Sequence, residues 1–285
     1  MTYRNMAVML DGSEPILATK VGVDFSTKNQ IKRQLGANID AGDQLRFNGD
    51  VDCKIGLDFL VRTSDGVRAS SGGSHDFVDF LFDNFHNTGQ NSMILNVGGN
   101  LYRDCFIDSF SLTVRPFEPV IGSATFSSYN PSSSVLTGAN TLLDSDLNTN
   151  DVVYGHNCLL SGAGNVVASD IINQLSYNKT YSRTPIYTLG SQQATSQIVD
   201  GVEVDMNVQS TGLNQLIGFS GNKLSSDFGV GLRDVGGSGV TYTAVVPPSN
   251  FDLIVNSGAH VVAEGYSVNG GDTLVTKATI KEVIL

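Results

Sequence analysis

A strict alternation of apolar and polar residues between positions 50 and 59 constrains the fold of this chain more than any other feature. The apolar members are Val51, Cys53, Ile55, Leu57 and Phe59. A period of two is typical of a β-strand that buries one face. The pattern returns later in the chain at Val202, Val204, Met206 and Val208. With 31 glycines and no tryptophan among 285 residues, the composition is also that of strands joined by turns. We therefore expect an all-β, mainly antiparallel fold.

The second occurrence of this strand belongs to a weak internal repeat with an offset of about 150 to 156 residues. Three further segments match across the two halves: 93–99 with 252–258, 105–114 with 261–270, and 120–126 with 274–280. Between the halves lies a stretch rich in Ser, Asn, Thr and Asp, which is typical of a linker. The sequence thus predicts two homologous domains, at 1–130 and 153–285, joined by a linker at 131–152.

Each half is also expected to contain one short helix. In the first half an apolar stripe lies between a capping residue, Ser74, and a terminating Gly89. The stripe consists of Phe77, Val78, Phe80, Leu81 and Phe85. The corresponding segment of the second half, 213–219, is shorter and is interrupted by Gly218.

The chain is acidic, with 17 Lys and Arg against 28 Asp and Glu and a net charge of −11. This balance argues against binding nucleic acid through a basic face. Both alternating strands have a mainly acidic polar side, formed by Asp50, Asp52, Asp58, Glu203 and Asp205. These residues either line a functional surface or form the solvated side of ordinary strands.

No motif for catalysis or metal binding is found. The three cysteines are widely spaced, the four histidines have no metal-ligand spacing, and no nucleophile elbow or phosphate loop is present. Asp108 and Glu264 occupy equivalent places in the repeat alignment. They form either a pair of carboxylates for acid–base chemistry or, as we prefer, bulge or strand-end positions. We expect no enzyme activity and no cofactor.

The order of these elements resembles a known family. An extended strand, a long polar loop, an alternating strand, a short helix and a glycine-linked run of strands end in the segment 110–114 before 124–126. This order is similar to the tail-tube fold of long-tailed bacteriophages and of type VI secretion systems. The resemblance covers both halves, like the tail proteins that carry two such domains in tandem. It implies two tail-tube-like, β-sandwich or barrel-forming domains, and trimeric rings with pseudo-sixfold symmetry that stack around a DNA-conducting channel.

The resemblance also implies roles for particular residues. The acidic residues Asp50, Asp52, Asp58, Glu203 and Asp205 would line the channel and repel DNA phosphates during passage. Basic residues of the long polar loop would contact neighbouring subunits or rings, unless this is simply a surface loop. These are Lys28, Lys32, Arg33 and Arg46.

The expected partners follow from the same resemblance. They are other copies of the chain and the tail terminator, tape-measure and baseplate proteins, with DNA only in passage and no membrane. The location would be the virion, after assembly in the bacterial cytoplasm. An adaptor or baseplate ring and a carbohydrate-binding host-recognition module are the alternatives.

Overall fold

The computed structural model describes residues 8–10, 14–27, 30–33, 44–47, 51–62, 92–135, 152–161, 172–189, 194, 196–211, 223–224, 228–232, 253–269 and 273–284. Within these ranges the chain is almost entirely antiparallel β-sheet, and the helical segment is a single 3-10 turn, Gly155–Asn157. The all-β prediction is therefore confirmed. Both predicted helices, at 74–89 and 213–219, lie outside the described residues.

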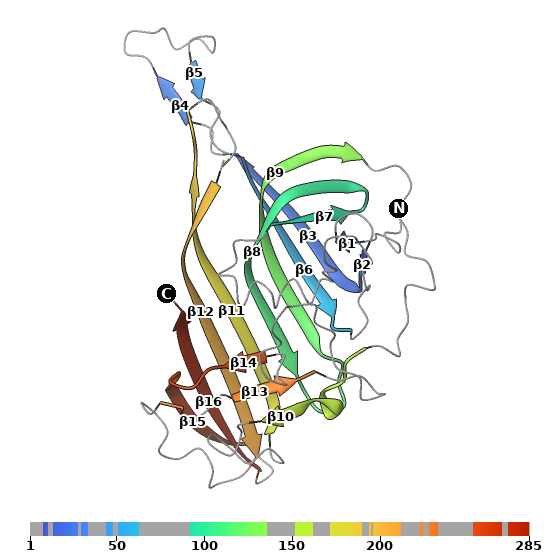
Figure 1. Ribbon diagram of the computed structural model, residues 1–285, viewed down its shortest axis with the longest axis vertical. Helices are drawn as coiled ribbons and strands as arrows, with labels where there is room; N and C mark the ends of the chain where they lie inside the picture. Colours follow the sequence, from blue (N-terminus) through green and yellow to red (C-terminus); the bar gives the residue numbers. More distant parts are fainter. Residues whose placement is uncertain are drawn as a thin grey trace.

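Most strands belong to one large sheet of 11 strands. Three of these extend it from the N-terminal part of β8: β1 (Val8–Leu10), β2 (Glu14–Ile16) and β7 (Met93–Val97). The other eight follow one another in the order β3-β6-β9-β8-β11-β12-β16-β15 (Figure 1). Their bounds are Ala18–Thr27 (β3), Val51–Leu60 (β6), Asn100–Val114 (β8), Ile121–Val135 (β9), Ile172–Ile186 (β11), Ser196–Thr211 (β12), His260–Asn269 (β15) and Thr273–Ile284 (β16).

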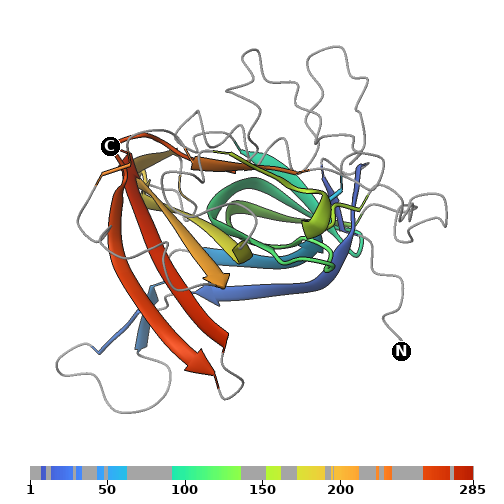
Figure 2. The same ribbon diagram turned by 90° about the horizontal axis from the view of Figure 1, so that it is seen from below.

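Two small sheets accompany the large one. A three-stranded sheet is formed by β10 (Leu159–Ser161), β13 (Phe228–Gly231) and β14 (Leu253–Val255). A two-stranded sheet is formed by β4 (Gln30–Arg33) and β5 (Gln44–Phe47). Figure 1 shows the β4–β5 pair at the top of the molecule and the three-stranded sheet across the lower part of β11 and β12. Figure 2, seen from below, shows that the large sheet is curved.

One face of the large sheet carries the hydrophobic core. Its buried side chains include the residues whose alternation predicted the two strands: Cys53, Ile55, Leu57, Phe59, Val202, Val204, Met206 and Val208. Phe228, Val230 and Val255 of the three-stranded sheet belong to the same core. The opposite face of the eight-stranded part, called the polar face below, carries the alternate residues, because successive side chains of a strand point to opposite sides.

The eight-stranded part consists of two four-stranded units with the same strand order. Numbered along the chain, the first unit contains β3, β6, β8 and β9, and the second contains β11, β12, β15 and β16. In each unit the first strand pairs with the second, the second with the fourth, and the fourth with the third. The units are joined by pairing between β8 and β11.

Two bulges recur at the same places in both units. β3 carries one extra residue, Thr19, opposite β6, and β11 carries one, Asn173, opposite β12. β8 carries an extra residue, Asp108, opposite β9, and β15 carries Val262 opposite β16. The members of each pair are 154 positions apart. A bulge is fixed by local strand geometry, so this agreement gives a register for the repeat that is independent of residue type.

The β4–β5 pair has its counterpart in the same register. Gln30 pairs with Phe47, and Thr184 of β11 pairs with Ile198 of β12. Gln30 and Thr184 are again 154 positions apart. The two-stranded sheet therefore corresponds to the outer ends of β11 and β12.

This register corrects one sequence alignment. The third strands were matched as 105–114 with 261–270, which made Asp108 equivalent to Glu264. The bulges instead make Asp108 equivalent to Val262, and Glu264 equivalent to Phe110. A shift by two residues keeps every side chain on its own face, so the alternation alone could not reveal the error.

The predicted linker begins too early. β9 continues to Val135 and pairs with β8 as far as Asn100. Residues 131–135 are therefore strand, despite their Ser-rich sequence, because β8 supplies backbone partners for them. Residues 136–151 lie outside the described residues, and the division into domains at 1–130 and 153–285 stays a prediction.

Candidate functional site

One row of paired residues crosses the polar face from β3 to β16. Its members, each directly opposite the next, are Lys20, Asp58, Ser123, Ser111, Asn178, Asp205 and Lys281. Residues directly opposite one another in an antiparallel pair lie on the same face. Two of the residues predicted to line a channel, Asp58 and Asp205, are thus brought into one row from different halves of the chain.

The other predicted lining residues are only partly described. Glu203 lies on the same face of β12 as Asp205, two positions away along the strand. Asp52 lies in β6, but its side chain is outside the described residues, and Asp50 is outside them altogether. The three described acidic side chains are therefore on a common face.

Lysines stand beside these acidic residues. Lys281 makes ion pairs with Glu203 and with Asp205, the latter at 3.8 Å. Lys20 is directly opposite Asp58. Partial burial raises the pKa of the Asp205 carboxyl above its usual range. Over the described residues the polar face therefore carries mixed charge, whereas the sequence led us to expect a mainly acidic one.

The basic residues assigned to subunit contacts fall in the two-stranded sheet. Lys32 and Arg33 belong to β4, and Arg46 belongs to β5 directly opposite Ile31. Lys28 lies outside the described residues. Three of the four candidates thus share a small sheet at one end of the molecule (Figure 1), well apart from the row of Asp58 and Asp205.

The junction between the two units has a gap in strand pairing. On one edge of β8, β7 pairs as far as Cys105 and β11 begins to pair at Ser109. Arg183 of β11 donates to the carbonyl oxygen of Ile107 in this gap, from Nε at 2.9 Å and from Nη2 at 2.6 Å. A backbone acceptor that neither strand reaches is thereby satisfied.

Arg183 is held tightly in this position. Its guanidinium lies 5.6 Å from the ring of Phe106 and 5.1 Å from the ring of Tyr181. Its Nε lies 4.0 Å from Oδ1 of Asp108. Burial lowers the pKa of Arg183, and the nearby Asp108 carboxylate opposes this shift. The charge remains, because an arginine side chain stays protonated.

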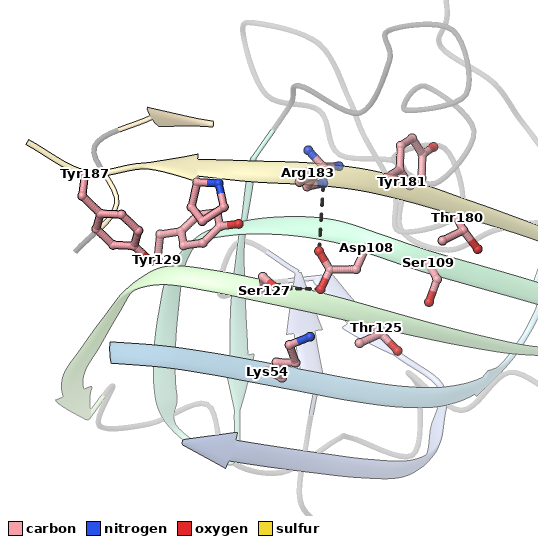
Figure 3. Close-up of a pocket in the computed structure, with 11 residues that line it drawn as sticks. Lys54, Asp108, Ser109, Thr125, Ser127, Tyr129, Thr180, Tyr181, Arg183 and Tyr187 are labelled. Carbon is pink, nitrogen blue, oxygen red and sulfur yellow. Dashed lines mark hydrogen bonds and ion pairs between the residues drawn. The ribbon is translucent and has the colours of Figure 1, made fainter. Parts of the chain in front are cut away.

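Asp108 is the bulge residue beside Arg183, and its other oxygen, Oδ2, accepts a hydrogen bond of 2.6 Å from Ser127. The bulge interpretation is therefore confirmed for Asp108, and the paired-carboxylate alternative loses its basis because Glu264 is not its equivalent. Figure 3 shows Asp108 between Arg183 and Ser127.

These residues line a cavity of about 530 Å³ that crosses β6, β9, β8 and β11. Its walls are formed by Lys54, Asp108, Ser109, Thr125, Ser127, Tyr129, Thr180, Tyr181, Arg183, Pro185 and Tyr187. Figure 3 shows Tyr129 and Tyr187 at one end of the cavity and Lys54 near the middle. The lining is rich in hydroxyl groups, with one carboxylate and two cations. It suits a polar, hydroxylated ligand.

Sequence reasoning did not single out Arg183 or this cavity. Arg183 falls where the order of elements predicted the polar loop of the second half, whereas the structure has strand β11 there, and an arginine in a loop is usually a solvated side chain. In the part of the chain that the structure describes, no three His, Cys, Asp or Glu side chains are grouped to hold a metal. No helix among those residues is long and apolar enough to cross a membrane.

No family model matches the chain, and no curated protein matches it.

Proposed function

We propose that this chain is a structural, non-enzymatic subunit of a bacteriophage tail tube. It assembles into stacked trimeric rings around a channel through which DNA passes. The observation that carries the proposal is the junction between β8 and β11, where the third strand of one four-stranded unit pairs with the first strand of the next.

The same kind of junction is available at both ends of the eight-stranded part of the large sheet. The outer strands are β3, a first strand, and β15, a third strand. In the described residues β3 pairs with β6, and β15 pairs with β16 apart from one bridge, Lys223 to His260. Two copies could therefore join β15 to β3 as β8 joins β11. Such a head-to-tail contact closes into a ring when the rotation allows.

Apolar side chains are exposed at both outer strands. Phe25 on β3 is 59% exposed and Val262 on β15 is 49% exposed. The equivalent residues at the internal junction are better covered. Lys179 is 0% exposed, and the side chain of Asp108 is only partly exposed. Exposed edge strands with apolar residues are a liability in a monomer. Covering both edges with neighbouring copies removes that liability.

In such a ring the polar face would line the channel. The row from Lys20 to Lys281 carries hydroxyl and amide side chains between balanced charges. A surface of this kind offers few strong contacts to a phosphate backbone, and the net charge of −11 adds a weak, salt-screened repulsion. Both properties favour passage of DNA over binding. Tail terminator, tape-measure and baseplate proteins are the proposed partners, and the virion is the proposed location.

Electron microscopy of the purified chain over a range of concentrations tests this proposal, with light scattering on the same samples. Hollow tubes or stacked trimeric rings are expected. A monomer at every concentration would contradict self-assembly and would favour an adaptor ring that needs another protein to initiate it.

The cavity of Figure 3 favours a second candidate, a carbohydrate-binding module. Tyr129 and Tyr187 could stack on a sugar ring while Asp108 and Lys54 bind its hydroxyl groups. A glycan array with the monomeric chain tests it. Binding that is lost in Tyr187→Ala would support this candidate, and no binding to any glycan would reject it.

A further inference from the structure

Three residues of the second unit lie in one row on the core side of the large sheet. Lys179 of β11, Val204 of β12 and Glu282 of β16 are directly opposite one another. With neighbouring strands about 4.8 Å apart, the Cα atoms of Lys179 and Glu282 are about 10 Å apart and their side chains share one face. The long stem of a lysine spans much of that distance.

Glu282 is hydrogen-bonded to a residue outside this row. Asn256, which follows β14, donates to Glu282 from its backbone nitrogen at 3.1 Å and from its side-chain Nδ2 at 2.7 Å. β14 also packs against β16. The side-chain amide of Asn256 is therefore held on the carboxylate that lies in the row of Lys179.

The surroundings of Lys179 suit a nucleophile. Its side chain is completely buried, and its Nζ lies 4.9 Å from the ring centre of Tyr181. Burial lowers the pKa of Lys179 to about 6, against an opposing effect of Glu282. At neutral pH the amine is then mostly uncharged, which is the protonation state in which a lysine attacks a carbonyl carbon.

We propose that Lys179 and Asn256 become joined by an isopeptide bond, with Glu282 transferring the proton. Nζ of Lys179 attacks Cγ of Asn256 and forms a C–N bond. Glu282 accepts a proton from the attacking nitrogen and delivers it to Nδ2, its present hydrogen-bond partner. The bond from Cγ to Nδ2 breaks and ammonia leaves. An amine and a primary amide thus give a secondary amide and ammonia, with no oxidant or cofactor.

The bond would tie the three-stranded sheet to the large sheet. Asn256 follows β14, whereas Lys179 lies in β11 near the middle of the large sheet. The first unit lacks this set of residues, since the equivalents of Lys179 and Glu282 there are Phe25 and Ser128. The strand order of the unit therefore does not require them, which favours a specific chemical role.

Intact-mass spectrometry of the denatured full-length chain tests the proposal without depending on ring assembly. The expected mass is about 17 Da below that of the sequence, the mass of ammonia. Digestion should give a branched peptide that joins the segments containing Lys179 and Asn256. Glu282→Gln and Lys179→Arg should each restore the full sequence mass.

A matched control is Lys277→Arg, which changes an exposed lysine of β16 and should keep the loss of ammonia. If Glu282→Gln does not fold, Asn256→Ala provides a second chain that lacks the reacting amide and should show its full mass. A wild-type chain at the full sequence mass overturns the proposal. So does a loss of about 17 Da that persists in Lys179→Arg.

Discussion

Asp108 and Val262 occupy the same position in the two four-stranded units, each as the extra residue of a bulge in the third strand. Their surroundings differ. Asp108 lies at a junction covered by β11, where it contacts Arg183, whereas Val262 lies on an outer strand and is half exposed. The same bulge therefore occurs once beside a neighbouring strand, β11, and once on an outer strand that has no such neighbour among the described residues.

Replacing Arg183 should destabilise the junction. Arg183→Ala removes two hydrogen bonds to the carbonyl oxygen of Ile107 and leaves that acceptor buried in the gap between β7 and β11. We expect a loss of about 2–3 kcal/mol in the free energy of unfolding, measured by denaturant titration. Arg115→Ala is the matched control, because its ion pair with Glu118 is exposed and should contribute less than about 0.5 kcal/mol. Equal effects of the two variants would contradict the role given to Arg183.

The thiol of Cys105 should be inert in the folded chain. Burial raises its pKa to about 12, and its Sγ donates to the carbonyl oxygen of Tyr102. A thiol reagent at pH 8 should label the partly exposed Cys158 and reach Cys105 only on unfolding. Rapid labelling of Cys105 under native conditions would be inconsistent with this burial.

The raised pKa of Cys105 also makes the stability of the folded chain depend on pH in the alkaline range. The unfolded chain loses the Cys105 proton near pH 9.0, whereas the folded chain keeps it up to about pH 12. The contribution to stability is therefore complete below about pH 9 and is lost as the pH rises toward 12. The free energy of unfolding, measured between pH 8 and 11, should fall less steeply with pH for Cys105→Ala than for the wild type. Identical slopes would show that the thiol does not titrate as described.

Reversing the charge of the polar row should affect DNA and leave folding intact. In the double variant Asp58→Lys, Asp205→Lys both changes are at partly exposed positions, so the chain should still fold, with a melting temperature somewhat lowered because each new lysine is directly opposite Lys20 or Lys281. Assembled particles should retain DNA in sedimentation assays, and the retention should fall as salt is raised. The double variant Asp58→Asn, Asp205→Asn removes charge without adding lysine and should retain less. If both variants misfolded, the two carboxylates would be needed for the sheet to fold, whereas misfolding of the lysine variant alone would mean that the added lysines disrupt it.

Much of the sheet could be predicted from local patterns. The alternation at 51–59 and 202–208 predicted both strands and the faces they bury, and the repeat predicted that matching segments recur in the two halves. The pairing register was harder, because a shift of two residues preserves the alternation. Only the bulges at Asp108 and Val262 distinguish the two alignments of the third strand.

The contacts of the site depend on residues far apart in the sequence. Arg183 lies opposite Ile107 because β8 is shared by β7 and β11, and no local pattern reports that sharing. The sequence did not indicate a partner for Glu203 and Asp205 of β12, because their partner Lys281 lies in β16, near the C-terminus. Charge on a strand face could therefore be predicted in sign, but its balance could not.

The proposed contact between copies predicts a specific pairing of residues at the outer strands. Lys179 is opposite Phe110 at the internal junction. By the 154-residue register, Phe25 of one copy would be opposite Glu264 of the next. Phe25→Asp should therefore abolish ring formation through like-charge repulsion, whereas Phe25→Lys should preserve it. Light scattering and electron microscopy measure both. Because Phe25 is largely exposed in the single chain, circular dichroism should show that both variants fold. The double variant Phe25→Asp, Glu264→Lys should regain assembly. If both this variant and Phe25→Lys stayed monomeric, β3 and β15 would not be the surfaces that join.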